Sequence, residues 1–231
     1  LYSQNDILKF IIPLVFLTVL CSGQQEKASI KDKGSVYFGI SRSFRSLKVF
    51  KMALKDYNEK RDWLQTRPEI SNNMTGFTVG SGLFISNKSY YDFNLFYYNQ
   101  KTKADGYSKY GYSSREFRIR DIGLGFDYLF TNSSLLNQIY IGSSLKISKL
   151  SFRSFSTFYK SWSVNGVNVI FAPKAQYIPS FLKKRGIIDF QFNLPLNLIE
   201  ATDLKTQMGV KDTQEHIWPY SFDISLKLSL L

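Results

Sequence analysis

Residues 218–230, WPYSFDISLKLSL, carry a pattern that returns along most of this chain. Every second side chain from Trp218 to Leu230 is apolar, and the side chains between them are Pro, Ser, Asp or Lys. Because successive side chains of a β-strand point to opposite faces, this stretch predicts a strand with one apolar face and one polar face.

The same alternation is present in seven segments upstream. They cover approximately residues 34–43, 74–86, 90–100, 117–130, 137–148, 164–177 and 187–198. Together with the last segment they predict eight strands, each long enough to cross a membrane when tilted. Pro173, Pro195 and Pro219 fall inside these patterns and are the main objection, because proline cannot donate to a strand ladder.

The connections between these segments alternate in length. In order they cover residues 44–73, 87–89, 101–116, 131–136, 149–163, 178–186 and 199–217, which is long, short, long, short, long, short, long. Bacterial membrane barrels with both termini in the periplasm have long outer loops and short inner turns. We therefore expect an all-β fold over residues 34–231: an eight-stranded antiparallel transmembrane β-barrel of up-and-down topology in the bacterial outer membrane.

The first long connection has a helical period instead. Leu47, Phe50, Leu54 and Tyr57 recur at helical spacing with charged residues between them, which predicts a short amphipathic helix in the first extracellular loop. Such a helix has three interpretations: a lid, an element that docks a partner, or an ordered loop.

The chain begins with features of an export signal. An apolar run at residues 10–20 is followed by small residues, so we expect a signal peptide over residues 1–23 and a periplasmic linker over residues 24–33. Lipidation of Cys21, the single cysteine, and a retained apolar helix are the alternatives.

Composition restricts the class of partner. Aromatic residues make up 16% of the chain, which suits half-buried strands, and the net charge of +12 indicates an anionic neighbour. An exported protein does not meet nucleic acid, so phosphorylated lipid or acidic glycan of the outer membrane fits better.

The polar faces of the predicted strands carry charges of both signs. In a soluble barrel of lipocalin type the apolar face would point inward, whereas in a membrane barrel the polar face lines the lumen. We expect the second case, with a lumen charge network that fills the interior and leaves no open pore. Its predicted members are Asp92, Asp127, Lys146, Asp189, Asp223 and Lys227.

The sequence offers little that predicts catalysis. Its one histidine, His216, lies near Glu215 and Ser221, and no cluster of metal-ligand residues or phosphate-binding motif is present, so we predict no enzyme activity, no cofactor and no metal. A lipid-modifying enzyme using His216 and a narrow channel are the alternatives.

Contact with other proteins is the function that remains. The segment 106–114, GYSKYGYSS, interleaves aromatic and small polar residues, which suits an adaptable contact surface. The predicted contact residues are Leu47, Phe50, Leu54, Tyr57, Tyr107, Tyr110 and Tyr112.

Two segments carry a family resemblance. DIGLGFDYLF at residues 121–130 and YSFDISLKLSLL at residues 220–231 resemble strands of small outer-membrane barrels such as OmpX and the transmembrane domain of OmpA. The abundance of Tyr, Asn, Lys and Ser is similar to that of barrel-only proteins of Bacteroidota, including the PorT-like group tied to type IX secretion. The resemblance implies a non-enzymatic barrel, a structural or accessory subunit of an envelope or secretion complex that contacts outer-membrane lipopolysaccharide and other envelope proteins.

Overall fold

The computed structural model describes residues 34–86, 89–131, 138–156, 161–179, 186–196 and 220–230. Its elements are β1 (Gly34–Arg45), α2 (Lys48–Glu59), β2 (Leu64–Thr66), β3 (Asn73–Ser86), β4 (Ser89–Ser108), β5 (Gly111–Phe130), β6 (Ile139–Ser156), β7 (Trp162–Tyr177), β8 (Gly186–Pro195) and β9 (Ser221–Ser229). The signal peptide, the linker and His216 lie outside the described residues.

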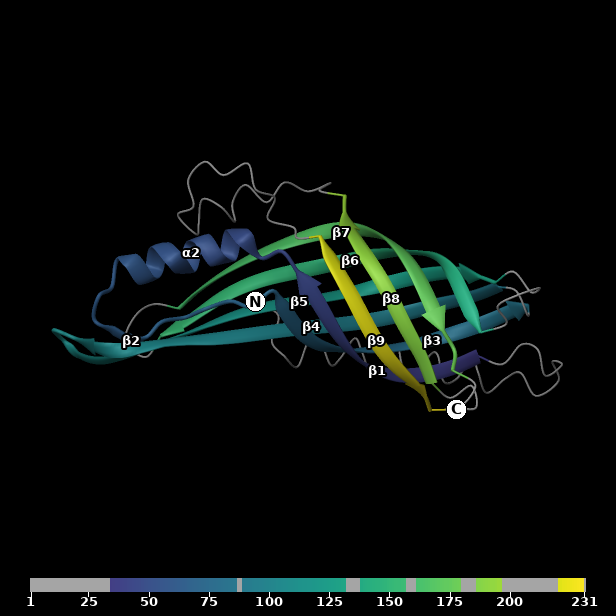
Figure 1. Cartoon of the computed structure of the whole chain (residues 1–231), viewed down its shortest axis with the longest axis horizontal. Helices are drawn as coiled ribbons and strands as arrows, with labels where there is room; N and C mark the ends of the chain where they lie inside the picture. Colours follow the sequence, from purple (N-terminus) through teal and green to yellow (C-terminus); the bar gives the residue numbers. More distant parts are fainter. Residues whose placement is uncertain are drawn as a thin grey trace.

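Eight of these strands form a closed antiparallel ring (Figure 1). Each strand pairs with its neighbours in the chain, β4 pairs with β5, and β1 pairs with β9 to complete the ring. The prediction of an eight-stranded up-and-down β-barrel is confirmed. The short strand β2 pairs with β4 as an addition to the ring.

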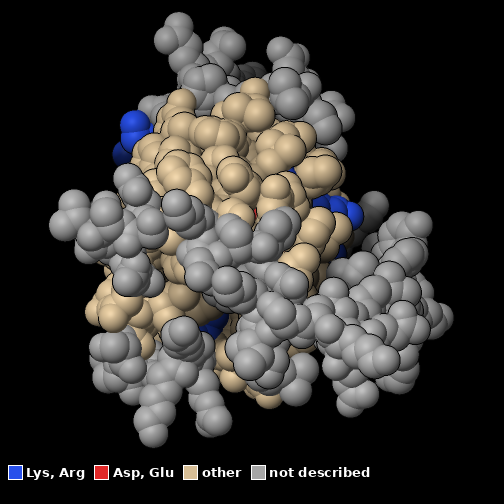
Figure 2. Space-filling model, turned by 90° about the vertical axis from the view of Figure 1, so that its right-hand side faces the viewer, with Lys and Arg blue, Asp and Glu red and all other residues tan. Residues whose placement is uncertain are grey.

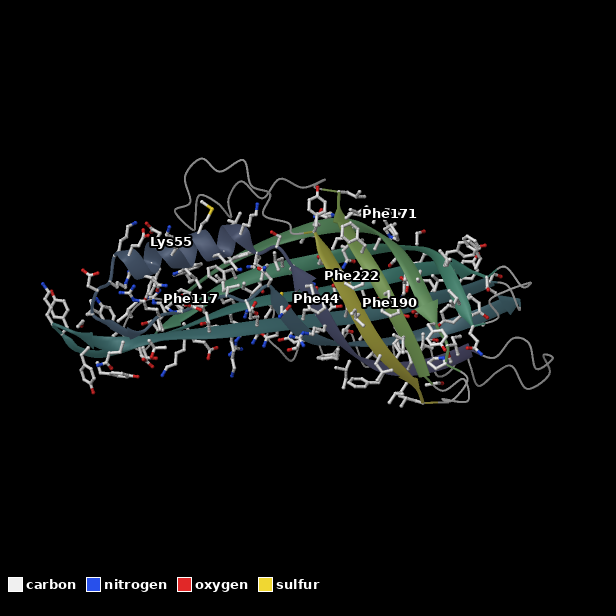
Figure 3. All side chains as sticks on the ribbon, viewed as in Figure 1. Phe44, Lys55, Phe117, Phe171, Phe190 and Phe222 are labelled. Atoms are coloured by element: carbon white, nitrogen blue, oxygen red, sulfur yellow. The ribbon has the colours of Figure 1, made fainter. Side chains whose placement is uncertain are left out.

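The strand alternation places apolar side chains outside and polar side chains inside. In β9, Phe222, Leu226 and Leu228 are exposed, whereas Asp223 and Lys227 are buried. Figure 3 shows Phe171, Phe190 and Phe222 projecting from the outer surface of β7, β8 and β9. An apolar outer face is the arrangement of a membrane barrel, and the opposite of a soluble ligand-binding barrel.

The end of the barrel opposite α2 is poor in charge on its visible surface. Figure 2 looks at this end, where the described atoms are mostly neither Lys and Arg nor Asp and Glu. Among the described residues, the structure has no helix with the length and apolar character that crossing a bilayer requires.

Two predicted loops are wrong in extent. β4 and β5 each have 20 residues and continue through 101–116 to a tight turn at Lys109 and Tyr110. β6 likewise continues to Ser156. A strand of 20 residues is about 66 Å long, whereas about 9–11 residues cross a membrane, so these strands project well beyond it. Charged outward side chains resemble a loop in the sequence, but buried Ala104, Phe117 and Ile119 keep the strand period on the inner face.

Glycine on the inner face of β3 makes room for aromatic rings. A Cβ at Gly80 would overlap the hydroxyl of Tyr37, and one at Gly82 would overlap the hydroxyl of Tyr90. Both tyrosines are 1% exposed and point into the lumen. The close approach of ring to backbone therefore requires glycine at these positions.

Two of the three prolines sit at an interruption of a ladder or at the end of a strand. In the β7–β8 ladder, Phe171 pairs with Leu194 and Lys174 with Gln191, and no pair is formed between them, where Pro173 lies. Pro195 is the last residue of β8. Pro219 lies outside the described residues. The barrel therefore tolerates Pro173 and Pro195 at interruptions or ends of strands.

Candidate functional site

The lumen contains a layer of ion pairs that joins five strands. Lys227 of β9 lies 2.7 Å from both Asp92 of β4 and Asp189 of β8. Lys174 of β7 contacts Asp127 of β5 and lies 3.1 Å from Asp189. The hydroxyl of Tyr37 donates to Asp92 at 2.7 Å, which adds β1 to the layer.

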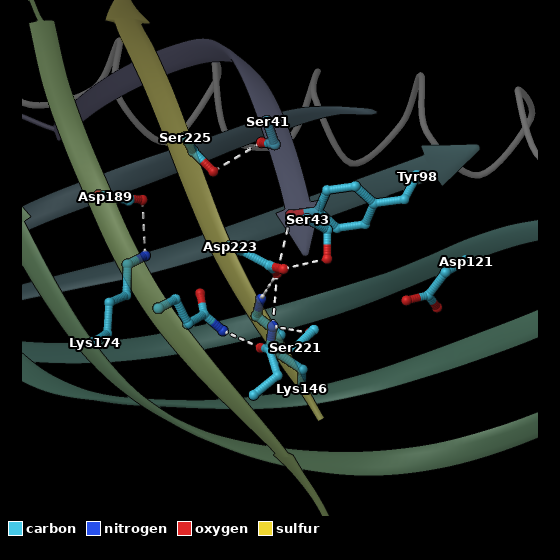
Figure 4. A network of polar contacts seen from close by, with 12 residues as sticks. Ser41, Ser43, Tyr98, Asp121, Lys146, Lys174, Asp189, Ser221, Asp223 and Ser225 are labelled. Atoms are coloured by element: carbon cyan, nitrogen blue, oxygen red, sulfur yellow. Dashed lines mark hydrogen bonds and ion pairs between the residues drawn. The ribbon is translucent and has the colours of Figure 1, made fainter. Parts of the chain in front are cut away.

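A second layer is centred on Asp223, and Figure 4 shows it together with Lys174 and Asp189 of the first layer. Asp223 accepts hydrogen bonds from Ser43, from Tyr98 at 3.1 Å and from Asn193 at 2.7 Å, and Lys146 Nζ lies 3.9 Å from it. The guanidinium of Arg45 donates to Asp121 at 2.6 Å. Its Cζ also lies 4.7 Å from the ring centre of Tyr98.

These contacts close the lumen. Charges removed from water are tolerated only when they are paired and hydrogen-bonded, and the two layers provide those partners across the ring. Beside Arg45, Lys146 and Asp223 a cavity of about 20 Å³ remains, which has room for about one water molecule. The described part of the lumen therefore offers no solute-sized passage.

All six residues predicted for the lumen charge network lie inside the barrel and are at most 5% exposed: Asp92, Asp127, Lys146, Asp189, Asp223 and Lys227. The structure distributes them over two layers rather than one cluster. Sequence reasoning missed Lys174, which lies in a weakly patterned strand, and Arg45, which it assigned to a loop. It also missed Asp121, although its place in the alternation of β5 was a usable signal.

The second part of the candidate site is the projecting end, defined as α2, β2, residues 99–120 of the β4–β5 hairpin, residues 149–156 of β6 and residues 162–165 of β7. Here α2 packs against the sheet through aromatic contacts. The rings of Phe50 and Phe152 are 5.3 Å apart, and those of Tyr57 and Phe117 are 5.0 Å apart. In Figure 3, Phe117 lies between the helix and the strands, whereas Lys55 points away from them.

This packing corrects part of the predicted contact surface. Leu47, Phe50 and Leu54 are 1%, 1% and 2% exposed, because they form the core between α2 and the sheet. Tyr57 is packed against the same core. The apolar face of the predicted helix is thus occupied within the chain and is not a free surface for a partner.

The predicted tyrosines at the tip of the β4–β5 hairpin are exposed. Tyr110 is 80% exposed, and the rings of Tyr107 and Tyr112 are 5.4 Å apart at a steep angle. A cleft of about 560 Å³ lies between this tip and the end of α2. Its lining is aromatic and basic: Tyr57, Lys60, Arg61, Trp63, Ser108, Lys109, Tyr110, Ser113 and Arg115.

A side-chain hydrogen bond between Thr66 of β2 and Asp105 of β4 also ties β2 to the hairpin outside the membrane. Lys103 Nζ lies 2.7 Å from Asp105. Hydrogen bonds from Lys103 and then from Thr66 of β2 lower the pKa of Asp105. Hydrogen bonding to Asp105 in turn raises the pKa of Lys103. In the described ranges, no group of three His, Cys, Asp or Glu side chains is arranged to hold a metal ion.

Comparison with known sequences gives a partial similarity. No protein-family model matches the chain. Over 108 residues it is 31% identical to the Na(+)/H(+) antiporter subunit E1 of Staphylococcus haemolyticus, which covers 46% of this chain and 67% of that protein. The similarity groups the aligned residues with that subunit. Because fewer than half of the residues are aligned, whereas the ring extends from Gly34 to Ser229, the similarity does not account for the barrel.

Comparison with solved structures gives an approximate likeness of shape. Ail, the attachment invasion locus protein of Yersinia pestis, was solved alone and in complex with the heparin analogue sucrose octasulfate. Each alignment covers 87% of this chain and 98% of Ail at 10% identity, with TM-scores of 0.44 and 0.43. Such values say nothing about what this chain binds. Its own closed ring and apolar outer face give it the architecture of a small outer-membrane β-barrel.

Proposed function

We propose that this chain is a non-enzymatic outer-membrane barrel that serves as a structural or accessory subunit of an envelope or secretion complex. It acts through its projecting end, which faces the outside of the cell, while both chain termini face the periplasm. The observation that carries the proposal is the contrast between a lumen closed by ion pairs and a tip that exposes three tyrosines. A type IX secretion complex is one such assembly.

Exposed tyrosine clusters suit contact with proteins. Tyr and Trp provide large contact areas with few rotatable bonds, and they are enriched at the centres of protein interfaces. The helix and β2 brace the hairpin that carries Tyr107, Tyr110 and Tyr112, so the surface is presented on a supported element. A supported surface loses less conformational freedom on binding.

Site-specific photo-cross-linking tests the docking role. A cross-linking amino acid at Tyr110 is expected to give discrete high-mass adducts in cells, and the same group at Lys55 on the exposed face of α2 is the control. Replacing Tyr107 and Tyr112 with Ser should remove the Tyr110 adducts while the barrel still migrates as a folded protein. Adducts that are unchanged in this double variant would contradict the proposal.

Cysteine labelling tests the orientation. Lys109→Cys at the hairpin tip should react with a membrane-impermeant maleimide on intact cells, whereas Gln138→Cys before β6 should react only after permeabilisation. The single native cysteine, Cys21, lies in the predicted signal peptide, so the background is low. The reverse labelling pattern would place the projecting end in the periplasm.

The non-enzymatic part of the proposal is tested at His216. Wild-type protein and His216→Ala are compared for acyl transfer and hydrolysis on phospholipid and lipid A. We expect no activity in either. Activity that is present in the wild type and lost in the variant would make the chain a lipid-modifying enzyme.

Movement of small cations through the lumen is the second candidate, on the strength of the similarity to the antiporter subunit. The buried Asp and Lys side chains are of the type that relay protons in membrane proteins. Vesicles that contain the protein and a pH-sensitive dye are given a sodium gradient. Proton flux equal to that of empty vesicles fits the closed lumen, whereas faster flux that is lost in Asp127→Asn would favour transport.

A further inference from the structure

The outer wall of the barrel changes from apolar to basic on one side only. On β4, β5 and β6, residues that point outward lie side by side in rows fixed by the strand register. From the apolar part toward the projecting end, three successive rows are Tyr97–Ile122–Lys149, Asn99–Arg120–Ser151 and Lys101–Arg118–Arg153. We name the five cations Lys101, Arg118, Arg120, Lys149 and Arg153 the basic wall.

The basic wall lacks enough negative charge of its own. Arg118 pairs with Glu116 at 2.5 Å. Within the described ranges, the other four cations have no carboxylate within 4.0 Å. The Nε atoms of Arg120 and Arg153 are buried and have no hydrogen-bond partner. Like charges directly opposite one another weaken a sheet, so this arrangement gains stability when an anion joins it.

The other strands do not repeat the feature at the same level. Outward residues of β3 there are Asn73 and Thr75, and those of β7 are Ser163 and Asn165. β1 contributes one cation, Arg42, whose Cζ lies 5.5 Å from the ring centre of Phe44. The basic wall is therefore a local feature of β4–β6 and not a general consequence of the chain's positive charge.

The position of the basic wall along the strands indicates which layer of the membrane it contacts. Ile122 is the last apolar outward residue of β5 before Arg120, and one step of two residues along a strand is about 7 Å. The headgroup layer on each side of the hydrocarbon is of similar thickness, about 5–8 Å. The basic wall thus begins where lipid headgroups begin. Guanidinium groups bind phosphate oxygens in pairs, and three of the five cations are arginines.

We propose that the basic wall binds the phosphate groups of anionic lipids in the leaflet that surrounds the projecting end. Arg120 and Arg153, which are diagonal neighbours on the outer faces of β5 and β6, bind the phosphate through their guanidinium groups, and Lys101 and Lys149 flank it from β4 and β6. The inference rests on the membrane location in the proposed function. It is independent of the tyrosine tip, which lies at the far end of the same hairpin.

The test measures lipid binding by the folded, full chain in detergent. Native mass spectrometry is used to titrate the protein with bis-phosphorylated lipid A. The variant R120Q/R153Q removes two charges from the basic wall, and K51Q/K55Q removes two charges from the exposed face of α2 as the matched control. We expect R120Q/R153Q to bind at least about tenfold more weakly, since hydrogen bonds to charged groups are lost, and K51Q/K55Q to bind as the wild type does.

Lipid A without phosphate is expected to bind wild-type protein as weakly as phosphorylated lipid A binds R120Q/R153Q. Equal affinity for both lipids, or equal binding by both double variants, would overturn the proposal. Inorganic pyrophosphate that displaces the lipid at matching concentrations would identify a site for free phosphate and reject the lipid.

Heat-modifiable gel migration confirms that each variant is folded. If R120Q/R153Q does not fold, K101Q/K149Q changes only exposed side chains and is measured against the same control. The lipid site and the docking role fail separately. A variant that loses lipid binding but keeps the Tyr110 cross-links affects the lipid site alone, and a variant that loses the cross-links but still binds lipid affects the docking role alone.

Discussion

At the residue scale, two glycines without side chains determine the shape of the inner face of β3. Gly80 and Gly82 have no side chain because the lumen space in front of them is filled by Tyr37 and Tyr90. The hydroxyl of Tyr37 is then held between Asp92 and Lys227, so a backbone property of one strand determines the position of an ion pair between two others.

Gly80→Ala is therefore expected to destabilise the barrel. The added methyl group forces Tyr37 away from Asp92, and overpacking of this kind lowers the free energy of unfolding by about 1–3 kcal/mol. Gly34→Ala is the matched control, because a Cβ there would be 3.7 Å from its nearest neighbour. Urea unfolding in lipid vesicles measures both; equal midpoints would mean that Tyr37 is not confined.

The tie between β2 and the hairpin should depend on pH. Because the pKa of Asp105 is lowered in the folded chain, its contribution to stability is complete above the ordinary pKa of an aspartate. It is lost as the pH falls through the lowered value. NMR titration should give Asp105 a lower pKa than a model aspartate, and Lys103→Gln should raise it. An unchanged pKa in this variant would assign the shift to other groups.

At the scale of elements, alternation predicts where strands occur better than where they end. The eight strands of the ring follow the apolar period of the lipid-facing side chains. Beyond the membrane that face becomes charged, so 101–116 resembled a loop, and the remaining signal was the inner period of Ala104, Phe117 and Ile119. The helix was predictable from Phe50 and Leu54, but its partner was not, because Phe152 lies about a hundred residues away.

Phe50→Ala should loosen α2 without opening the ring. Loss of a buried aromatic side chain costs about 3–5 kcal/mol in a well-packed core, and Phe50 is one of three buried residues of α2. Hydrogen exchange is expected to rise over residues 48–59 and to stay slow in β1 and β9. Met52→Ala, at a site 42% exposed, is the control. Equal exchange in both variants would show that the helix is held by other contacts.

At the scale of the whole molecule, the lumen network joins strands that are remote in sequence. Which residues are buried was predictable from the polar face of each strand. Which cation meets which carboxylate was not, because Lys227 of β9 and Asp92 of β4 are brought together only when β1 pairs with β9 and the ring closes. The network thus depends on the circumference and stagger of the barrel, which no single strand encodes.

Lys227→Met should destabilise the whole barrel. It leaves Lys174, at 3.9 Å from Asp92 and 3.1 Å from Asp189, as the remaining cation beside these two buried carboxylates. Removal of one partner of a buried ion pair costs about 3–5 kcal/mol. Adding Asp92→Asn should recover part of the loss, since one uncompensated charge is removed. Unfolding midpoints of the single and double variants measure this. A double variant weaker than the single one would show that Asp92 has other essential partners.

The pairing of β1 with β9 has a consequence for biogenesis. Ser41 and Ser225 meet at this seam although they are 184 positions apart in the chain. Bringing such distant segments together costs about 4–5 kcal/mol in loop-closure entropy, and until then both strands expose unpaired edges. A variant that lacks β9 would keep two such edges, on β1 and β8, and aggregate. The edges of β1 and β8 therefore stay open to wrong partners until β9 is available to pair with both.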